Sequence, residues 1–288
     1  MKRILYQKII IGAMGILLGF IGIVSIMAAD TVVPIVQVSN LKYSYDQMQQ
    51  DLAALQERYP GQMVVDSLGT TADGRDITEV ILGDVDAEHH ILIQATMQAR
   101  EYMNTVLAMN QIEDYLSGSE NRSYADQTWK ANAEGVDLNR NFDAGWDTYI
   151  GASGPSTECY KGTAPASEPE AQAVLSVAQN YDLDCCIAYH SYGNLIYWNY
   201  GSQDTVLDAD QRLAQCVSDV TGYEMHSTVQ DSTDAAGCSD YFVLNLGIPA
   251  VTIENGGSEC PMPIEEYQPM YQRNQDLWAA VACLYKNS

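Results

Sequence analysis

The sequence predicts an α/β protein, a single domain in which a mixed, twisted sheet is covered by helices on both faces. Two mostly apolar runs, Ile91–Met97 and Cys185–Tyr189, are too short for typical helices and lack the polar alternation of half-exposed strands. They therefore read as strands buried on both faces. Stretches with helical spacing, such as 44–59 and 167–181, alternate with these runs along the chain. This alternation indicates a sheet with helices packed on either side.

The N-terminus has the pattern of a targeting segment. Three basic residues within the first eight precede an uncharged, mostly apolar run from Ile9 to Ala29, which Asp30 ends. The run is about long enough to span a bilayer. Basic residues flank it only on the N-terminal side, which disfavours a buried helix. We expect residues 1–29 to be a signal peptide or membrane anchor, 30–42 a linker and 43–288 the domain, exported to the cell surface or beyond.

The remaining elements follow from periodicity and from turn residues. Ser44 is expected to cap a helix that runs to about Tyr59, where Pro60 stops it. Alternating residues predict two strands, 63–69 and 76–82, joined by a Gly-containing turn. Further predicted strands cover 195–198 and 250–254, and further helices cover 101–116, 208–221 and 267–285. The stretch 117–162 is irregular and rich in Gly, Ser, Asn and Asp.

Charge and cysteine content exclude several classes of protein. The formal net charge of −24 leaves no basic stripe to neutralise phosphates, so nucleic acid is not an expected partner. Contact with a membrane is expected only through the N-terminal segment. The seven cysteines are an odd number, so at least one cannot pair within the chain, and Cys185 and Cys186 are expected to pack in the core. No Cys-x-x-Cys pair supports a structural zinc ribbon.

Four segments place reactive side chains at strand ends or in loops, where α/β sheets hold their sites. They are Met97–Tyr102, Gly135–Phe142, Tyr189–Tyr192 and Val251–Asn255. Taken singly, each has an ordinary structural explanation: a core histidine, a surface cap, or arginines paired within an acidic chain. The explanations do not account for all four segments together and in this order.

In that order the segments resemble the zinc carboxypeptidase family of the carboxypeptidase A type. Gly135-Val-Asp-Leu-Asn-Arg-Asn-Phe142 is identical to the family's substrate-carboxylate motif. Other matching segments are Trp129–Asn132, Tyr160–Gly162, Ser167–Glu170, His190–Tyr192 and Gly247–Glu254, and the resemblance runs from about Ser44 to the C-terminus. The tail Cys260–Pro263 is similar to bacterial members, including those that cleave γ-D-glutamyl–diaminopimelate peptides. The resemblance implies a secreted or membrane-anchored metalloprotease, a hydrolase that removes C-terminal residues from peptides or peptidoglycan stem peptides by means of a zinc-activated water.

The resemblance also implies a role for each matching residue. Glu101 and His190 match two of the three zinc ligands, and Glu254 matches the carboxylate that moves the proton of the water. Lys130 lies where the family stabilises the oxyanion.

Four further residues match the substrate-binding positions. Arg140 and Asn139 match the pair that binds the terminal carboxylate, while Arg100 and Tyr192 match further substrate-binding positions.

The chain departs from the family at three points. Gln98 stands where the first zinc histidine belongs, and an amide oxygen is a poor zinc ligand beside imidazole. The interval from Glu101 to Arg140 is shorter than usual by about a strand and its loop, so the rest of the sheet would have to bridge a deleted inner strand. The mobile substrate tyrosine has no counterpart, because Ser232 or Thr233 falls at its position and Ser239 near the side-chain pocket.

Two functional hypotheses remain open. Asp137 accepts hydrogen bonds only, so it could hold the NH₂ of Gln98 and turn the carbonyl oxygen toward zinc, giving an active enzyme. Alternatively the chain is a degenerate relative that binds peptides with weak or no zinc and little catalysis.

Overall fold

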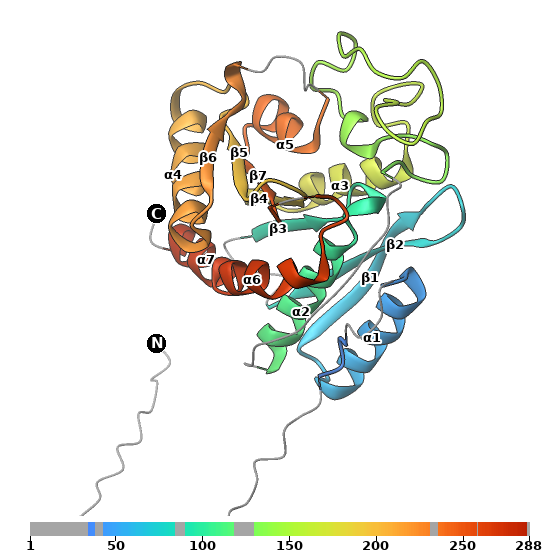
Figure 1. Cartoon of the computed structure of the whole chain (residues 1–288), viewed down its shortest axis with the longest axis vertical. Coiled ribbons are helices and arrows are strands. Elements are labelled where there is room, and N and C mark those ends of the chain that lie inside the picture. The colour runs from blue at the N-terminus through green and yellow to red at the C-terminus, as the bar shows by residue number, and fades with distance from the viewer. Residues whose placement is uncertain are drawn as a thin grey trace, which may run out of the picture. The chain divides into compact units, whose positions relative to one another are not determined.

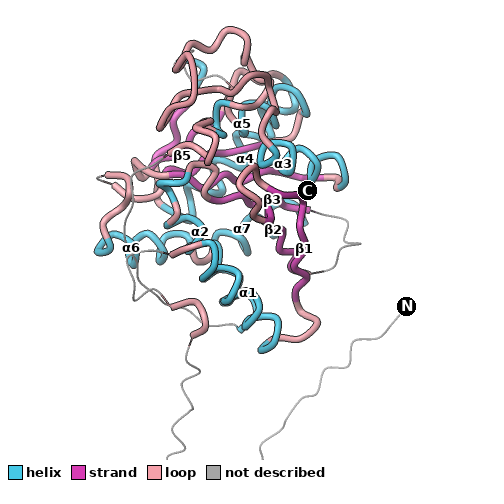
Figure 2. Tube along the Cα trace, turned by 90° about the vertical axis from the view of Figure 1, so that its right-hand side faces the viewer, coloured by secondary structure: helices cyan, strands magenta, loops and turns pink. Residues whose placement is uncertain are grey.

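The computed structural model describes residues 34–37, 43–83, 90–117, 130–230, 236–257 and 259–286. The predicted leader, residues 1–29, lies outside these ranges. The described part forms a mixed α/β fold, as the sequence predicts (Figure 1, Figure 2).

The larger sheet has five strands and positions the site. Its order is β3 (His90–Ala95), β4 (Leu183–His190), β7 (Ala250–Glu254), β5 (Leu195–Trp198) and β6 (Glu224–Ser227). β3, β4 and β7 run parallel to one another, β5 is antiparallel to β7, and β6 is parallel to β5. The carboxyl ends of the three parallel strands therefore meet at one edge of the sheet.

A second, separate sheet pairs β1 (Met63–Thr70) with β2 (Asp76–Leu82) in antiparallel register. The expectation that the rest of the sheet bridges the deleted strand is wrong, because β2 and β3 are not paired in the described part of the chain. With no strand between them to supply hydrogen-bond partners, the sheet is divided in two. The hairpin is instead tied to α1 (Tyr45–Arg58), where the Tyr45 hydroxyl accepts a hydrogen bond from the backbone of Asp76 (3.1 Å).

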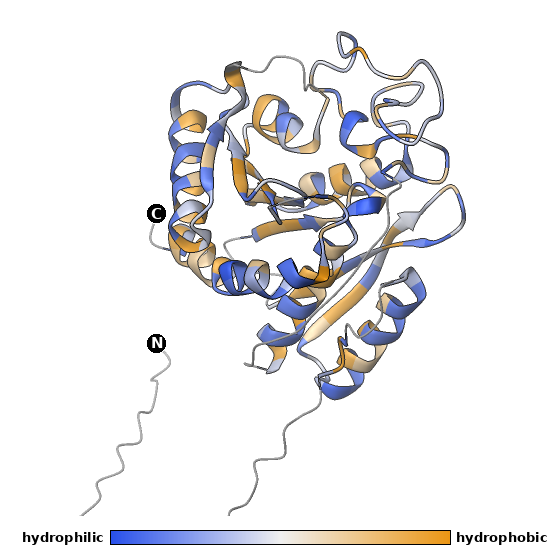
Figure 3. Cartoon of the chain, viewed as in Figure 1, coloured by the Kyte–Doolittle hydropathy of each residue, from blue (hydrophilic) through white to orange (hydrophobic). Residues whose placement is uncertain are grey.

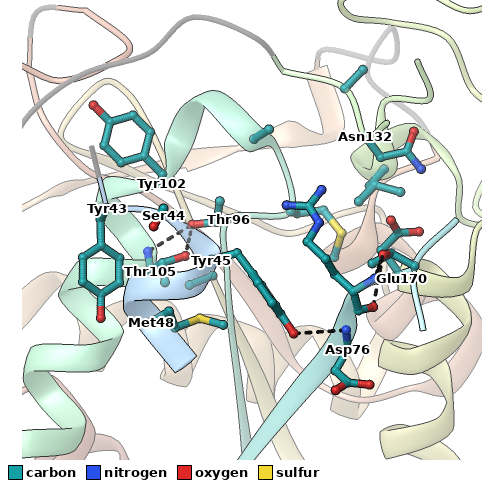
Figure 4. A pocket seen from close by; sticks show the side chains of 17 residues that line it. Tyr43, Ser44, Tyr45, Met48, Asp76, Thr96, Tyr102, Thr105, Asn132 and Glu170 are labelled. Atoms are coloured by element: carbon teal, nitrogen blue, oxygen red, sulfur yellow. Dashed lines mark hydrogen bonds between the residues drawn. The ribbon is translucent and has the colours of Figure 1, made fainter. Parts of the chain in front are cut away.

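A pocket of about 510 Å³ is lined by the end of β3, the start of β2 and the first turn of α1. Figure 4 shows the hydrogen bond between the Tyr45 hydroxyl and the backbone of Asp76, with Glu170 among the other side chains that line the pocket. Met97, Ala99 and Tyr102 line this pocket, whereas Gln98 and Glu101, which alternate with them, do not. The residues predicted to bind zinc, to bind substrate or to act in catalysis therefore do not line this pocket.

Helices cover both faces of the larger sheet. One face packs against α2 (Met103–Ser117), α4 (Asp204–Thr221), α6 (Ile264–Asn274) and α7 (Leu277–Lys286), and the other against α3 (Pro169–Asn180) and α5 (Cys238–Tyr241). On β4, Cys185, Ile187 and Tyr189 belong to the hydrophobic core between the sheet and α2, α4, α6 and α7. Cys186 belongs to the core between the sheet and α3 and α5. Figure 3 shows β3 and β5 coloured mostly as apolar. The remaining short helical turns are η1 (Ala99–Glu101), η2 (Leu138–Arg140), η3 (Thr228–Gln230) and η4 (Phe242–Leu246).

Most predicted elements are confirmed, including the Ser44 cap, whose hydroxyl accepts from the backbone of Gln47. The single helix predicted over 267–285 is wrong. The segment forms two helices, α6, which ends at Asn274, and α7, which begins at Leu277. The buried side-chain amide of Asn274 donates to the carbonyl of Met270. Such a bond offers the backbone an alternative to the helical ladder. β6 and α5 were not predicted, since both are short and lack a clear period.

Residues 34–37 contact the domain directly. The carboxylate of Glu113 on α2 accepts hydrogen bonds from the backbone N–H groups of Ile35 and Val36 (both 2.9 Å), and the Val36 side chain is buried. Among the described helices, none has the length and apolar character needed to cross a membrane. The seven cysteines are all described and form no disulfide, and Cys185 and Cys186 are buried in the core as predicted.

Candidate active site

Three parallel strands deliver the central residues to one edge of the sheet. Gln98 and Glu101 follow β3, His190 ends β4, and Glu254 ends β7 directly opposite His190 in the strand register. The carboxyl ends of parallel strands are the usual place for a site in α/β proteins. Here the topology brings together residues that are far apart in the sequence.

Glu101 and His190 form a close, buried pair. Nδ1 of His190 lies 2.9 Å from Oε2 of Glu101, and both side chains are at most 3% exposed. Glu101 Oε2 makes no aligned hydrogen bond, and neither does His190 Nε2. Burial lowers the pKa of His190, but the carboxylates of Glu101 and Glu254 outweigh it and raise the pKa above its usual value. Two metal-ligating atoms thus face each other in a site that favours positive charge.

Asp137 fixes the orientation of the Gln98 side chain. Its Oδ1 accepts a hydrogen bond from Gln98 Nε2 (2.8 Å), and Asp137 is fully buried. Its Oδ2 accepts from the backbone N–H of Cys159 (3.1 Å) and lies 3.1 Å from the Lys130 ammonium. A carboxylate can only accept, so the amide must present its NH₂ to Asp137 and turn its oxygen elsewhere. The contact between Gln98 and Asp137 is the one that the sequence suggested.

The donor atoms allow a test of whether zinc fits here. Within the described ranges no group of three His, Cys, Asp or Glu side chains could hold a metal ion. Glu101 and His190 supply two usual zinc ligands with unused lone pairs, and Gln98, three residues before Glu101, adds an amide oxygen because its NH₂ is held by Asp137. The residues therefore fit zinc as two strong ligands and one weak ligand.

Glu254 has the protonation behaviour of a general base. Burial and the nearby Glu101 carboxylate raise its pKa to about 7, although His190, Lys130 and Arg140 act in the opposite direction. A carboxyl group that titrates near neutrality can both take up and return a proton.

The residues of the carboxylate motif lie on η2. The Asn139 side-chain oxygen accepts from the backbone N–H of Cys238 (2.9 Å), and Arg140 Nη1 donates to the carbonyl of Asn139 (2.7 Å). The Arg140 guanidinium lies over the ring of Tyr149, 5.4 Å from its centroid. Its positive charge also acts to lower the pKa of Glu254.

Ser239 and its neighbours form a group of hydroxyls at the base of α5. Ser239 Oγ lies 2.8 Å from Thr252 Oγ1, which also accepts from the Tyr200 hydroxyl (2.9 Å). The alternatives for the missing tyrosine, Ser232 and Thr233, lie outside the described residues.

Arg100 and Tyr192 lie toward the rim. Arg100 forms an exposed ion pair with Glu158 (3.4 Å), and Tyr192, two residues after β4, is 50% exposed. No hydrogen bond joins either side chain to Glu101, His190 or Glu254 within the described part.

A chain of buried amides behind the site was not predicted. Asn104 on α2 donates to Ser191 Oγ (3.2 Å) and accepts from Asn255 Nδ2 (3.2 Å), and Asn255 Oδ1 accepts from Asn274 (2.9 Å). Ser191 and Asn255 directly follow His190 and Glu254, and Asn104 lies one turn beyond Glu101. The signal available in the sequence was a polar residue at an apolar helix position.

Comparison with known proteins gives a consistent result. A profile of the zinc carboxypeptidase family matches residues 48–130 and 115–275. The γ-D-glutamyl-L-diamino acid endopeptidase 1 of Lysinibacillus sphaericus is 26% identical over 292 residues, covering 83% of this chain and 72% of the relative. The crystal structure of thrombin activatable fibrinolysis inhibitor has a TM-score of 0.73 at 21% identity over 91% of this chain and 79% of that one. Murein-tripeptide amidase of Escherichia coli O157 has a TM-score of 0.52 at 18% identity over 80% and 94%, and at such identities the structural likeness concerns the fold alone.

Proposed function

Because the chain belongs to the zinc carboxypeptidase family, we propose that it is an exported metallocarboxypeptidase that hydrolyses the C-terminal bond of peptides or of cell-wall stem peptides. The observation that carries the proposal is the Asp137–Gln98 hydrogen bond, which engages the NH₂ of Gln98 and leaves its amide oxygen as the atom that could join Glu101 and His190 in binding zinc.

The residues can divide the reaction among them. Zinc held by Gln98, Glu101 and His190 would supply a Lewis acid that acidifies water and polarises a carbonyl. Glu254, with a pKa near 7, accepts the proton of the attacking water and returns it to the leaving amine.

Charged groups around the reacting bond complete the site. Lys130, held 3.1 Å from Asp137, places its ammonium where negative charge develops on the carbonyl oxygen. Arg140 and Asn139 bind the terminal carboxylate of the substrate, for which the planar guanidinium is suited. Glu101, His190 and Glu254 lie at or just after strand ends, and Asn139 and Arg140 lie on η2, so the sheet and this turn set their spacing, whereas Lys130 is held by Asp137.

The expected substrate is a peptide with a polar C-terminal side chain. The hydroxyls of Ser239, Thr252 and Tyr200 would line the floor of the side-chain pocket. The L. sphaericus relative is named for the cleavage of γ-D-glutamyl-L-diamino acid bonds, which supports stem peptides as a substrate class. We place the enzyme at the cell surface or outside the cell on the basis of the N-terminal segment, with no nucleic acid as partner because of its −24 charge.

A specific observation favours a second candidate, a degenerate peptide-binding protein. The site has two usual zinc ligands, and the Lys130 ammonium already neutralises Asp137 beside them. In that case Arg140 and Asn139 would still bind peptide carboxylates while zinc was weak or absent.

Zinc content and zinc affinity of the purified protein separate the two candidates. We expect measurable zinc in the unaltered protein, affinity about tenfold higher in Gln98→His, and lower affinity in Asp137→Ala, since removal of a group that orients a ligand typically costs about 10- to 100-fold. Zinc binding found only in Gln98→His, with peptide binding intact in both proteins, would establish the degenerate candidate. Unchanged affinity in Asp137→Ala would refute the orienting role of Asp137.

A further inference from the structure

A loop between η2 and α3 places an aromatic ring on the arginine of the carboxylate motif. The Arg140 guanidinium lies 5.4 Å from the centroid of the Tyr149 ring, and both side chains are half-buried. A ring packed on the face of a guanidinium restricts its rotation and leaves the in-plane N–H groups directed outward. Tyr149 therefore contacts the Arg140 guanidinium at cation–π distance and limits its movement.

Lys161 holds the Tyr149 loop from behind. Its ammonium donates to the carbonyls of Trp146 (2.6 Å) and Tyr149 (3.0 Å), and it lies 4.2 Å from the centre of the Trp146 ring. The Trp146 indole N–H donates in return to the carbonyl of Lys161 (2.9 Å). These contacts close a short ring of interactions around residues 146–149. The loop is irregular, yet the position of Tyr149 within it is fixed.

Arg140 is thus held from two directions. Nη1 donates to the backbone carbonyl of Asn139, and the ring of Tyr149 covers the guanidinium. Asn139 is itself fixed through its side chain to the backbone of Cys238 on α5. Burial raises the pKa of the Tyr149 phenol, against the opposing effect of Arg140, so the hydroxyl stays neutral and able to donate.

We propose that Tyr149, held in place by Lys161, is a positioning residue that orients Arg140 for a free terminal carboxylate. This inference rests on the role proposed above for Arg140. It assigns a task to Lys161, which the proposed reaction does not use. Tyr149 performs this task from the loop after η2.

The first test measures Arg140 without any ligand. Nitrogen-15 NMR of the arginine side chains follows the rotation of the Arg140 guanidinium in the unaltered protein, in Tyr149→Phe and in Tyr149→Leu. We expect faster rotation in Tyr149→Leu and little change in Tyr149→Phe, because the phenylalanine ring keeps the stacking contact. Ile150→Ala is the matched control, since Ile150 is the next residue of the loop and is 94% exposed. Equal rotation in Tyr149→Leu and the unaltered protein would overturn the proposal.

The second test compares binding of a dipeptide with a free C-terminal carboxylate and of the same dipeptide as its amide. Calorimetry on zinc-stripped protein avoids turnover. Tyr149→Leu and Lys161→Met should weaken binding of the carboxylate about tenfold and leave binding of the amide unchanged, while Tyr149→Phe and Ile150→Ala should match the unaltered protein. If the unaltered protein does not distinguish the two dipeptides although the NMR effect is present, the role of Arg140 in the proposed function fails and the positioning by Tyr149 stands.

Discussion

Asp210 makes the stability of the fold depend on pH in a way that can be measured. It lies on α4 with no exposed surface, and its two oxygens accept the backbone N–H groups of Ala250 (3.0 Å) and Asn199 (2.9 Å). Ala250 begins β7, the strand that ends in Glu254. Burial raises the pKa of Asp210 from 3.8 to about 6, although the two hydrogen bonds lower it. The folded protein therefore holds this proton more tightly than the unfolded chain does.

The size of the effect follows from linkage. A shift of about 2 units at about 1.4 kcal/mol per unit gives about 3 kcal/mol. Because the pKa is raised on folding, this contribution is complete below about pH 4 and is lost as the pH rises through about 6. The free energy of unfolding should thus carry a term that falls by about 3 kcal/mol between pH 4 and 7.

Urea unfolding of the unaltered protein and of Asp210→Asn, at four or five pH values between 4 and 7, isolates this term from the other carboxylates. Asparagine leaves one backbone N–H without an acceptor, which costs about 1–3 kcal/mol at every pH. The free energy of unfolding of the unaltered protein should therefore exceed that of Asp210→Asn by the largest amount at pH 4. This excess should fall by about 3 kcal/mol by pH 7. A difference that stays constant over this range would show that burial does not raise the pKa of Asp210.

Three further predictions follow from the site and the surface. Asn104→Leu and the matched variant Asn110→Leu should each lower the free energy of unfolding by about 1–3 kcal/mol, because each removes a buried amide, but only Asn104→Leu should lower zinc affinity, by about tenfold. Equal zinc affinities, read by competition with a chelator, would assign Asn104 a purely structural role. Glu254→Gln should lower kcat on a stem peptide by about 10²- to 10⁴-fold with little change in KM, as followed by mass spectrometry of the products. Cys283 is the exposed cysteine, so a thiol reagent should modify about one thiol rapidly in the native protein and none rapidly in Cys283→Ser.

Sequence patterns determined the elements whose residues carry their own signal. Period and capping predicted α1, and apolar runs predicted β4, β5 and β7, because these patterns reflect burial that each segment needs wherever it lies. The order of the motifs was enough to indicate the family, which the profile match over residues 48–275 supports.

Contacts between distant segments were decided only by the tertiary structure. The division of the sheet between β2 and β3 depends on the lack of a hydrogen-bond partner, which no local pattern records. The break between α6 and α7 falls at a buried amide, Asn274, which bonds both the carbonyl of Met270 on α6 and the side chain of the distant Asn255.

The contacts within the candidate active site were likewise decided by the tertiary structure. The sequence placed Gln98 and Asp137 in one site through the family resemblance, and the fold supplied the 2.8 Å hydrogen bond that orients the amide. Tyr149 gave no signal of its own, and Asn104 gave only that of a polar residue at an apolar helix position, because a buried polar group or a stacked ring acquires its role from the neighbour that it contacts. Local sequence therefore determined which segments could form strands, helices and motifs, while the packing of those segments decided which side chains meet and which atoms remain available for zinc and for substrate.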